Sequence, residues 1–199
     1  MKPRVLLVHG LWMQAPALFY WARRLRAAGF EPVYFSYKSL LEEPDSARVR
    51  LRQAALERPD THILAHSLGG LVTLNALAGE RSFNGRIICV GSPLAGSRTA
   101  RALASHHAGR LAGRSLSLLC QGLQRVPEGL RVSVIAGTKP HGLGRLLQHF
   151  DEPSDGTVAL SETRIPGLER HVTVPVSHSG QLFSKTVADA VLGLLKSPP

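Results

Sequence analysis

One stretch decides the fold of this chain: Thr61-His62-Ile63-Leu64-Ala65-His66-Ser67-Leu68-Gly69-Gly70. A short apolar run leads into a lone serine, and a helical pattern follows directly after it. Strand, sharp turn and helix in this order predict a nucleophile elbow, which presents its serine between a strand and a helix at strained backbone angles. Small residues are needed two positions before and after that serine, and Ala65 and Gly69 meet the requirement. We therefore expect Ser67 to be a nucleophile.

A serine in this place has a simpler interpretation, because serine is also a favoured N-cap for a helix that starts at Leu68. The usual elbow has glycine at both small positions, whereas alanine occupies the first one here. Catalysis by serine needs a base, a carboxylate that orients the base, and backbone N–H groups that hold the oxyanion. In folds with such an elbow the chain order is serine, acid, histidine.

Strand-like and helical patterns alternate along the chain on both sides of this stretch. Strands are predicted at residues 5–8, 33–35, 63–65, 87–90, 132–136 and 171–174, and helices at residues 18–28, 48–56, 68–78 and 181–195. The alternation predicts an α/β fold with a mostly parallel sheet of about six strands and helices on both faces. Ligands bind such sheets at the carboxyl ends of the strands, where each candidate motif lies.

Length and composition suit one globular domain over residues 1–199, with 44% hydrophobic residues. No window approaches the roughly 20 apolar residues of a membrane span, and the first residues do not resemble a leader peptide. The two cysteines, Cys89 and Cys120, are far apart and have no metal-ligand spacing. We expect reduced thiols, no metal and a cytoplasmic protein.

The formal net charge of +10 favours anionic surfaces as partners. The arginines are spread over several predicted helices, and no basic run is interleaved with aromatic residues. No zinc-finger or helix-turn-helix signature is present, so a nucleic-acid partner is not expected. A solvated, arginine-rich surface is the favoured interpretation.

Residues 97–130 interrupt the alternation with a long strand-free segment rich in arginine and leucine. Its five arginines, which face a single acid at Glu128, are Arg98, Arg101, Arg110, Arg114 and Arg125. One or two amphipathic helices here would either form a small cap or lid over the site or simply cover one face of the sheet. A basic cap would also bring the protein to anionic lipid by peripheral association.

The loop after the first strand, His9-Gly10-Leu11-Trp12, is the candidate for an oxyanion hole. Such a hole combines the N–H of the residue after the nucleophile with one from this first loop, which predicts Leu68 and Leu11. His9 precedes the nucleophile, so we interpret it as a loop histidine hydrogen-bonded to backbone. Trp12 either lines an acyl pocket or packs against the loop.

Asp155 is the favoured acid, within Ser154-Asp155-Gly156-Thr157-Val158, although an Asp-Gly pair is also common in simple turns. Asp151 is the reserve among the other acids after the nucleophile, Glu80, Glu128, Asp151 and Glu152. His178 is the favoured base, because it follows the last predicted strand and a neutral imidazole can accept the serine proton. The alternatives are His171, His149 and His141.

With these residues the chain resembles the α/β-hydrolase family, and within it small bacterial lipases and esterases whose elbow also reads Ala-His-Ser-x-Gly-Gly. The resemblance rests on five motifs, which are the His9-Gly10 loop, the 65–70 elbow, residues 91–97, residues 154–158 and His178. In the third motif Leu94 stands where lipase-like members often carry a histidine. The candidate pocket residues are Trp12, His66 and Leu94.

The resemblance implies a minimal α/β-hydrolase fold, with residues 97–130 as a cap insertion. It implies a serine hydrolase that cleaves small carboxylic esters through an acyl-enzyme, using Ser67, Asp155 and His178, with neither metal nor cofactor. Two alternatives stay open. The same residues would serve a thioesterase or acyltransferase, and a hydrolase-like scaffold can also be a non-catalytic binding protein.

Overall fold

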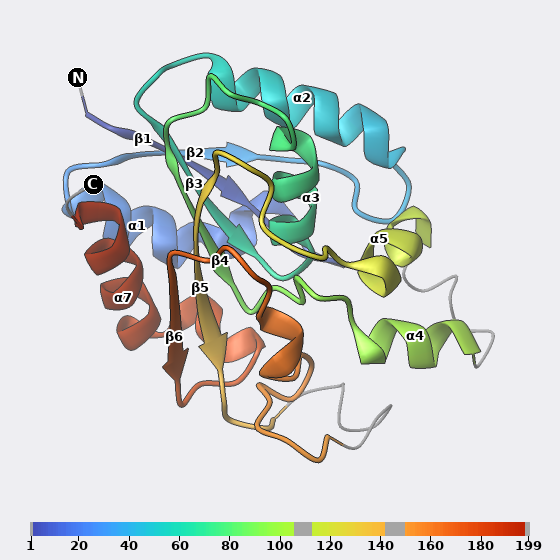
Figure 1. The fold of residues 1–199 in the computed structure, drawn as a ribbon. Helices are drawn as coiled ribbons and strands as arrows, with labels where there is room; N and C mark the ends of the chain where they lie inside the picture. Colours follow the sequence, from blue (N-terminus) through green and yellow to red (C-terminus); the bar gives the residue numbers. More distant parts are fainter. Residues whose placement is uncertain (1, 106–112, 142–149, 198–199) are drawn as a thin grey trace.

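Six parallel strands form one open sheet in the computed structural model, which describes residues 2–105, 113–141 and 150–197 (Figure 1). The strands are β1 (Arg4–Val8), β2 (Glu31–Phe35), β3 (Thr61–His66), β4 (Arg86–Val90), β5 (Arg131–Gly137) and β6 (Arg170–Val174). Their order is β2-β1-β3-β4-β5-β6, and every neighbouring pair is parallel. The predicted sheet of about six strands is confirmed. After β1 the chain adds β2 on one side and then β3 on the other, so the strand order reverses between β1 and β3. Doubly wound sheets bind their ligands at such a reversal.

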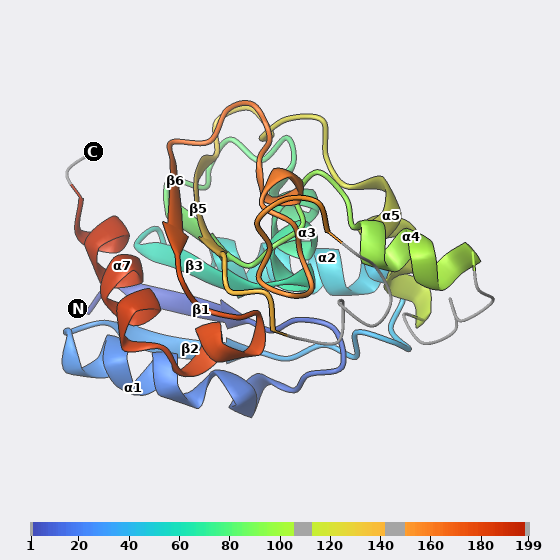
Figure 2. The same ribbon diagram turned by 90° about the horizontal axis from the view of Figure 1, so that it is seen from below.

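Helices cover both faces of the sheet, as Figure 2 shows. On one face, Val5 and Leu7 of β1 pack with α1 (Phe19–Ala27) and α7 (Lys185–Lys196). On the other face, Leu6 and Val8 pack with α2 (Pro44–Leu56) and α3 (Leu68–Leu77). Because both sides of the central strands are buried, the strands read as continuous apolar runs in the sequence.

Two short helices, α4 (Arg98–Ser105) and α5 (Leu116–Gln121), pack against each other in the segment that interrupts the alternation. Ala100 and Leu119 join the core on the α2–α3 side. Residues 106–112, which lie between α4 and α5 and include Arg110, are outside the described residues, so the predicted cap is described only in part.

Helix ends differ from the sequence prediction more than strand ends do. The last helix begins at Lys185, because residues Ser179–Phe183 form the separate 3-10 turn η4. Ser184 caps α7 by accepting the N–H of Val187 at 3.3 Å. Among the helices of the described segments, none has the length and apolar character needed to cross a membrane.

Candidate active site

Ser67 occupies the sharp turn between β3 and α3 with φ 54° and ψ −124°. A non-glycine residue rarely adopts positive φ, and such strain persists where the surrounding structure enforces it. Here the backbone N–H of Ser67 donates to the carbonyl of Val90 at 2.9 Å. The Ser67 side chain makes no capping hydrogen bond to α3, so it does not act as an ordinary helix cap.

Glycines allow two segments to approach Ser67 closely. A Cβ on Gly69 would lie 2.7 Å from the carbonyl oxygens of Val8 and His9, and one on Gly10 would lie 2.9 Å from Ser67 Cβ. The loop after β1 therefore lies directly beside the serine. Both predicted oxyanion donors belong to these neighbours, because Leu11 follows Gly10 and Leu68 is the first residue of α3.

His178, in the loop after β6, connects Ser67 to Asp155. Its Nε2 lies 3.1 Å from Ser67 Oγ, and its Nδ1 lies 2.7 Å from Asp155 Oδ2. The backbone N–H of His178 also donates to the Asp155 carbonyl at 2.9 Å. Three residues that are far apart in the sequence thus form one chain of hydrogen bonds. In the part of the chain that the structure describes, Asp155 and not Asp151 is the carboxylate bonded to His178.

Asp155 is only 1% exposed, yet both of its carboxylate oxygens are hydrogen-bonded. Oδ1 accepts the backbone N–H groups of Thr157 at 3.0 Å and Val158 at 2.8 Å. Burial alone would raise the pKa of Asp155, but the charge and hydrogen bond of His178, together with the two N–H groups, hold that pKa below its usual value. The carboxylate is therefore ionised at neutral pH.

Gln181 is a further neighbour of this carboxylate, and its Nε2 donates to Asp155 Oδ2 at 2.9 Å. This contact was not predicted from the sequence. A glutamine that follows His178 by three positions carries no motif, and nothing in the local pattern separates it from a solvated side chain.

His66 lies in direct contact with His178. Their ring centroids are 4.9 Å apart, and His66 Nε2 lies 3.4 Å from the His178 carbonyl oxygen. Burial, with the charge of His178 as a smaller cause, lowers the pKa of His66 to about 3. His66 is consequently a neutral, buried ring at neutral pH.

Among the described residues, the other candidate histidines have different partners. His9 is buried, stacks on Tyr37 at 4.5 Å between ring centroids and bonds only to backbone groups. His171, at the start of β6, bonds to Thr163 Oγ1 at 2.8 Å. His141 is exposed, and His149 lies outside the described residues. Within the described ranges, no group of three His, Cys, Asp or Glu residues is arranged to hold a metal.

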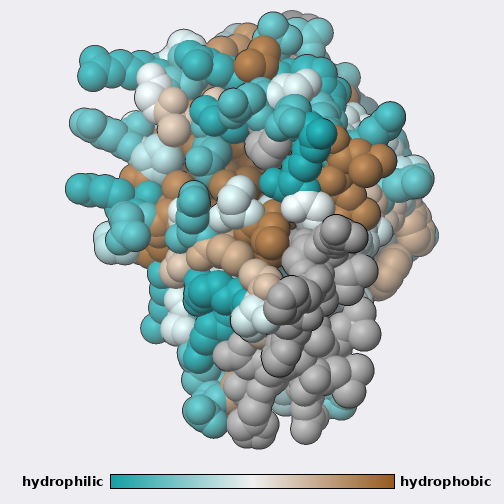
Figure 3. Space-filling model, turned by 90° about the vertical axis from the view of Figure 1, so that its right-hand side faces the viewer, coloured by the Kyte–Doolittle hydropathy of each residue, from teal (hydrophilic) through white to brown (hydrophobic). Residues whose placement is uncertain are grey.

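A cavity of about 310 Å³ opens beside Ser67 and His178. Its wall is mainly apolar, with Leu11, Met13, Pro93, Leu103, Leu119 and Leu182. Trp12 and His66 also line it, whereas Leu94 is fully buried in the core and does not. Because α4 and α5 each supply wall residues, these two helices border the cavity. Figure 3 views the molecule from that side, where hydrophobic patches lie among hydrophilic side chains.

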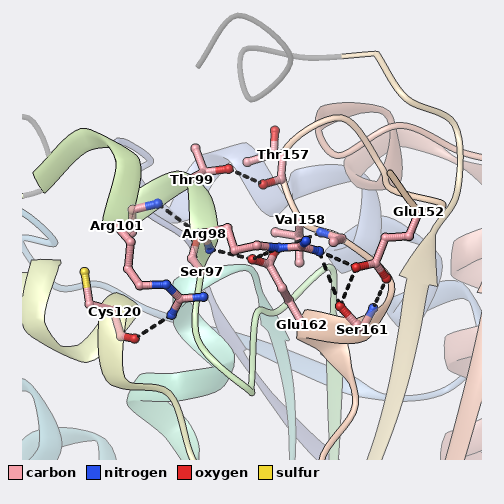
Figure 4. Close-up of polar contacts among 12 residues, drawn as sticks. Ser97, Arg98, Thr99, Arg101, Cys120, Glu152, Thr157, Val158, Ser161 and Glu162 are labelled. Carbon is pink, nitrogen blue, oxygen red and sulfur yellow. Dashed lines mark hydrogen bonds and ion pairs between the residues drawn. The ribbon is translucent and has the colours of Figure 1, made fainter. Parts of the chain in front are cut away.

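A buried glutamate attaches α4 to the loop that carries Asp155 (Figure 4). Glu162 is 4% exposed and accepts the backbone N–H groups of Arg98 at 2.5 Å and Ala159 at 2.8 Å. Burial raises the pKa of Glu162, against the opposing effect of these N–H groups and of the Arg98 charge. The first turn of α4 is thus fixed to the acid loop by a desolvated carboxyl group.

Two more contacts support the same attachment. The guanidinium of Arg98 pairs with Glu152, and Thr99 Oγ1 donates to the carbonyl of Thr157 at 2.9 Å (Figure 4). Thr99 and Thr157 both line the cavity, so their hydrogen bond joins two of its walls.

The sequence matches no protein-family model, and no curated protein matches it. Solved structures do match. The mature form of the lipase BlEst2 from Bacillus licheniformis has a TM-score of 0.81 at 22% identity, over 98% of this chain and 92% of that chain. A hydrolase from Pseudomonas aeruginosa PA01 has a TM-score of 0.65 at 19% identity, over 98% and 91% of the two chains.

A thioesterase domain from the curacin biosynthetic pathway is also similar, with a TM-score of 0.63 at 15% identity, over 98% of this chain and 92% of that chain. Similarities at these identities concern the fold. The chain has the α/β-hydrolase fold, as its sequence predicted.

Proposed function

We propose that this chain of α/β-hydrolase fold is a serine hydrolase that cleaves carboxylic esters. The observation that carries the proposal is the hydrogen-bonded series from Ser67 Oγ through His178 to Asp155, at 3.1 Å and 2.7 Å. Nucleophile, base and orienting carboxylate stand in the order and geometry that acyl transfer requires. The adjoining apolar cavity supports an ester with an apolar acyl group.

In the proposed reaction, Ser67 Oγ attacks the ester carbonyl carbon while its proton passes to His178 Nε2. The tetrahedral oxyanion then collapses, the bond to the alcohol oxygen breaks, and that oxygen leaves with the proton from His178. Water, deprotonated by His178, attacks the acyl-enzyme and releases the acid and free Ser67. Asp155 stays ionised and holds the imidazole in the tautomer that both steps need.

The oxyanion is assigned to the backbone N–H groups of Leu11 and Leu68. Support comes from the close approach of the loop after β1 to Ser67 and from the position of Leu68 at the positive end of α3. Backbone N–H donors cannot be removed by substituting a side chain. Ser67 is therefore the residue whose substitution tests the proposal.

The decisive experiment combines covalent labelling with turnover. Wild-type protein should react with a fluorophosphonate at Ser67 and hydrolyse p-nitrophenyl esters in a series from acetate to palmitate, with an optimum of chain length. Ser67→Ala should lose both activities. Labelling that persists in Ser67→Ala, or a wild type without labelling and turnover, would refute the proposal and favour a non-catalytic binding role.

A thioester is a second candidate substrate, because one of the similar structures is a thioesterase domain. The same nucleophile and base would cleave a carbon–sulfur bond, and an alcohol in place of water would make the reaction an acyl transfer. Hydrolysis of matched oxygen and sulfur esters with the same acyl group would rank the two. Product analysis with added alcohol would detect transfer.

Peripheral association with anionic lipid, through the basic residues of the cap segment, belongs to the proposal as well. The net charge of +10 supports it. Two ion pairs offset part of this charge, since Arg98 pairs with Glu152 and Arg114 pairs with Glu43. Arg101 donates to the neutral Cys120 carbonyl and keeps its charge. Co-sedimentation with anionic vesicles should weaken as salt rises, and binding that salt does not affect would exclude this mode.

A further inference from the structure

Gln181 contacts the candidate acid from within the protein interior. It lies on η4 and is 0% exposed. Its Nε2 donates to Asp155 Oδ2 at 2.9 Å, and the same oxygen binds His178 Nδ1 at 2.7 Å. One carboxylate oxygen therefore has two donors, one from the base and one from a neutral amide.

The orientation of this amide follows from chemistry. With the amide reversed, its oxygen would face the ionised carboxylate and the pair would repel each other, so the NH₂ group is the one that contacts Asp155. The backbone of Gln181 is fixed on both sides. Its N–H donates to the Ser177 carbonyl at 3.0 Å, and its carbonyl accepts the indole N–H of Trp21 at 3.2 Å.

The end of β5 leaves room for this contact. A Cβ on Gly137 would lie 2.4 Å from Gln181 Nε2 and 2.7 Å from Asp155 Cβ. Any side chain at that position would displace the amide, the carboxylate or both. The lack of a side chain at Gly137 thus leaves the amide and the acid room for their contact.

We propose that Gln181 is a positioning residue, which fixes the Asp155 carboxylate for its contact with His178. The inference rests on the proposed function. The N–H groups of Thr157 and Val158 hold Oδ1, and the Gln181 amide holds Oδ2, so the plane of the carboxylate is set from both ends. The amide also takes part of the hydrogen-bonding capacity of Oδ2, which limits how strongly Asp155 stabilises a protonated His178.

Within residues 2–105, 113–141 and 150–197, the titratable groups and the hydroxyl that contact His178 come from three places in the fold. Asp155 comes from the acid loop, His66 from the end of β3, and Ser67 from the turn after it. Gln181 itself is uncharged. Replacing it with another neutral residue leaves every formal charge in place and changes only the hydrogen bond and the geometry.

Gln181→Met keeps the volume of the side chain and removes the donor. We expect kcat for a p-nitrophenyl ester to fall roughly tenfold or more, with KM within about twofold, because the base is then misaligned. The acid limb of the pH profile of kcat/KM should move to higher pH, since Oδ2 then accepts a hydrogen bond from His178 alone. A packing role alone would not move that limb.

Trp21→Phe is the matched control. It removes the indole N–H that holds the Gln181 carbonyl and so loosens the same turn, but it leaves the amide in place. Its acid limb should coincide with that of the wild type. A Gln181→Met protein with wild-type kcat and an unmoved acid limb, whatever its melting temperature, overturns the proposal.

A measurement on the wild type covers the case in which Gln181→Met does not fold. The side-chain amide protons of Gln181 should exchange slowly in NMR spectra, because the amide is buried and donates to Asp155. Exchange as fast as that of a solvated glutamine overturns the proposal. This readout needs no turnover, so a wild type without Ser67-dependent hydrolysis refutes the proposed function and leaves the positioning contact to be judged by NMR.

Discussion

The rings of His66 and His178 lie 4.9 Å apart, and His66 Nε2 lies 3.4 Å from the His178 carbonyl oxygen. Two adjacent imidazoles are hard to charge together in a buried place. The burial of His66, which lowers its pKa to about 3, resolves the conflict by keeping that ring neutral. His178 is the ring of this pair that contacts Ser67, with its Nε2 3.1 Å from Ser67 Oγ.

The neutral state of His66 predicts how stability depends on pH. In the unfolded chain this histidine takes up a proton near pH 6.5, while in the folded chain it stays neutral down to about pH 3. The unfolded state therefore binds more protons between these values, and stability falls as pH decreases. The contribution of one such histidine is about 1.4 kcal/mol for each pH unit below 6.

Urea unfolding of the wild type and of His66→Gln at pH 7, 6 and 5 would measure this slope. The variant should lose less stability between pH 6 and pH 5 than the wild type does. The pKa values of His9, His62 and His171 are also lowered, mainly by burial, so part of the slope remains in the variant. Equal slopes in the two proteins would contradict the prediction.

Leu103 of α4 lines the cavity, and a larger side chain there should shorten the acyl group that fits. For Leu103→Phe we expect kcat/KM for p-nitrophenyl octanoate to fall roughly tenfold, because one or two methylene groups are worth about 1 to 3 kcal/mol in such a site. The rate with the acetate ester should stay within about twofold. A uniform loss across the series would indicate general damage to the site.

Removal of the Glu162 carboxyl should loosen the attachment of α4. Glu162→Ala leaves the buried N–H groups of Arg98 and Ala159 without their acceptor, at an expected cost of about 2 to 4 kcal/mol in the free energy of unfolding. Selectivity for acyl-chain length should broaden, because α4 forms part of the cavity wall.

Glu169→Ala is the control for that substitution. Glu169 is a more exposed glutamate that pairs with Arg131 and Arg86, so its removal should cost less than about 1 kcal/mol. It should also leave chain-length selectivity unchanged. Similar losses of unfolding free energy in the two variants would argue against a special role for the buried Glu162 carboxylate.

The contacts of α4 predict that hydrolysis rates do not depend on whether the ester is monomeric or aggregated. If α4 stays fixed to the acid loop by Glu162 and Thr99, as the contacts indicate, rates for each accessible substrate molecule should be equal in the two forms. A sharp rise in rate above the critical micelle concentration would instead show that the cap segment moves at an interface.

The strands were predicted from sequence to within a few residues, because burial on both faces makes each one an apolar run. Helix ends were less accurate, as the later start of α7 at Lys185 illustrates. Ser67, Asp155 and His178 were found from motifs, and the fold brings them together, although their catalytic roles stay predictions. Gln181 and Glu162 were not foreseen, because a buried polar contact depends on which distant segments meet.

Leu94 is a residue that the sequence placed in the pocket and the structure places in the core. Its motif placed it near the site, and it does follow β4, but its side chain turns into the core. The position of a residue after a strand fixes which end of the sheet it occupies and does not fix the direction of its side chain. Pocket residues are consequently harder to predict from sequence than residues such as Ser67, Asp155 and His178, which lie in recognisable motifs.

The main-chain N–H groups of Thr157 and Val158 hold the Asp155 carboxylate, and the same two residues line the cavity. Substitution at either position can therefore reshape the wall without removing a donor from the acid, provided that proline is avoided. In this loop, substrate preference can thus change while the hydrogen bonds to Asp155 are kept. Positions 157 and 158 are therefore suitable starting points for directed evolution of the chain.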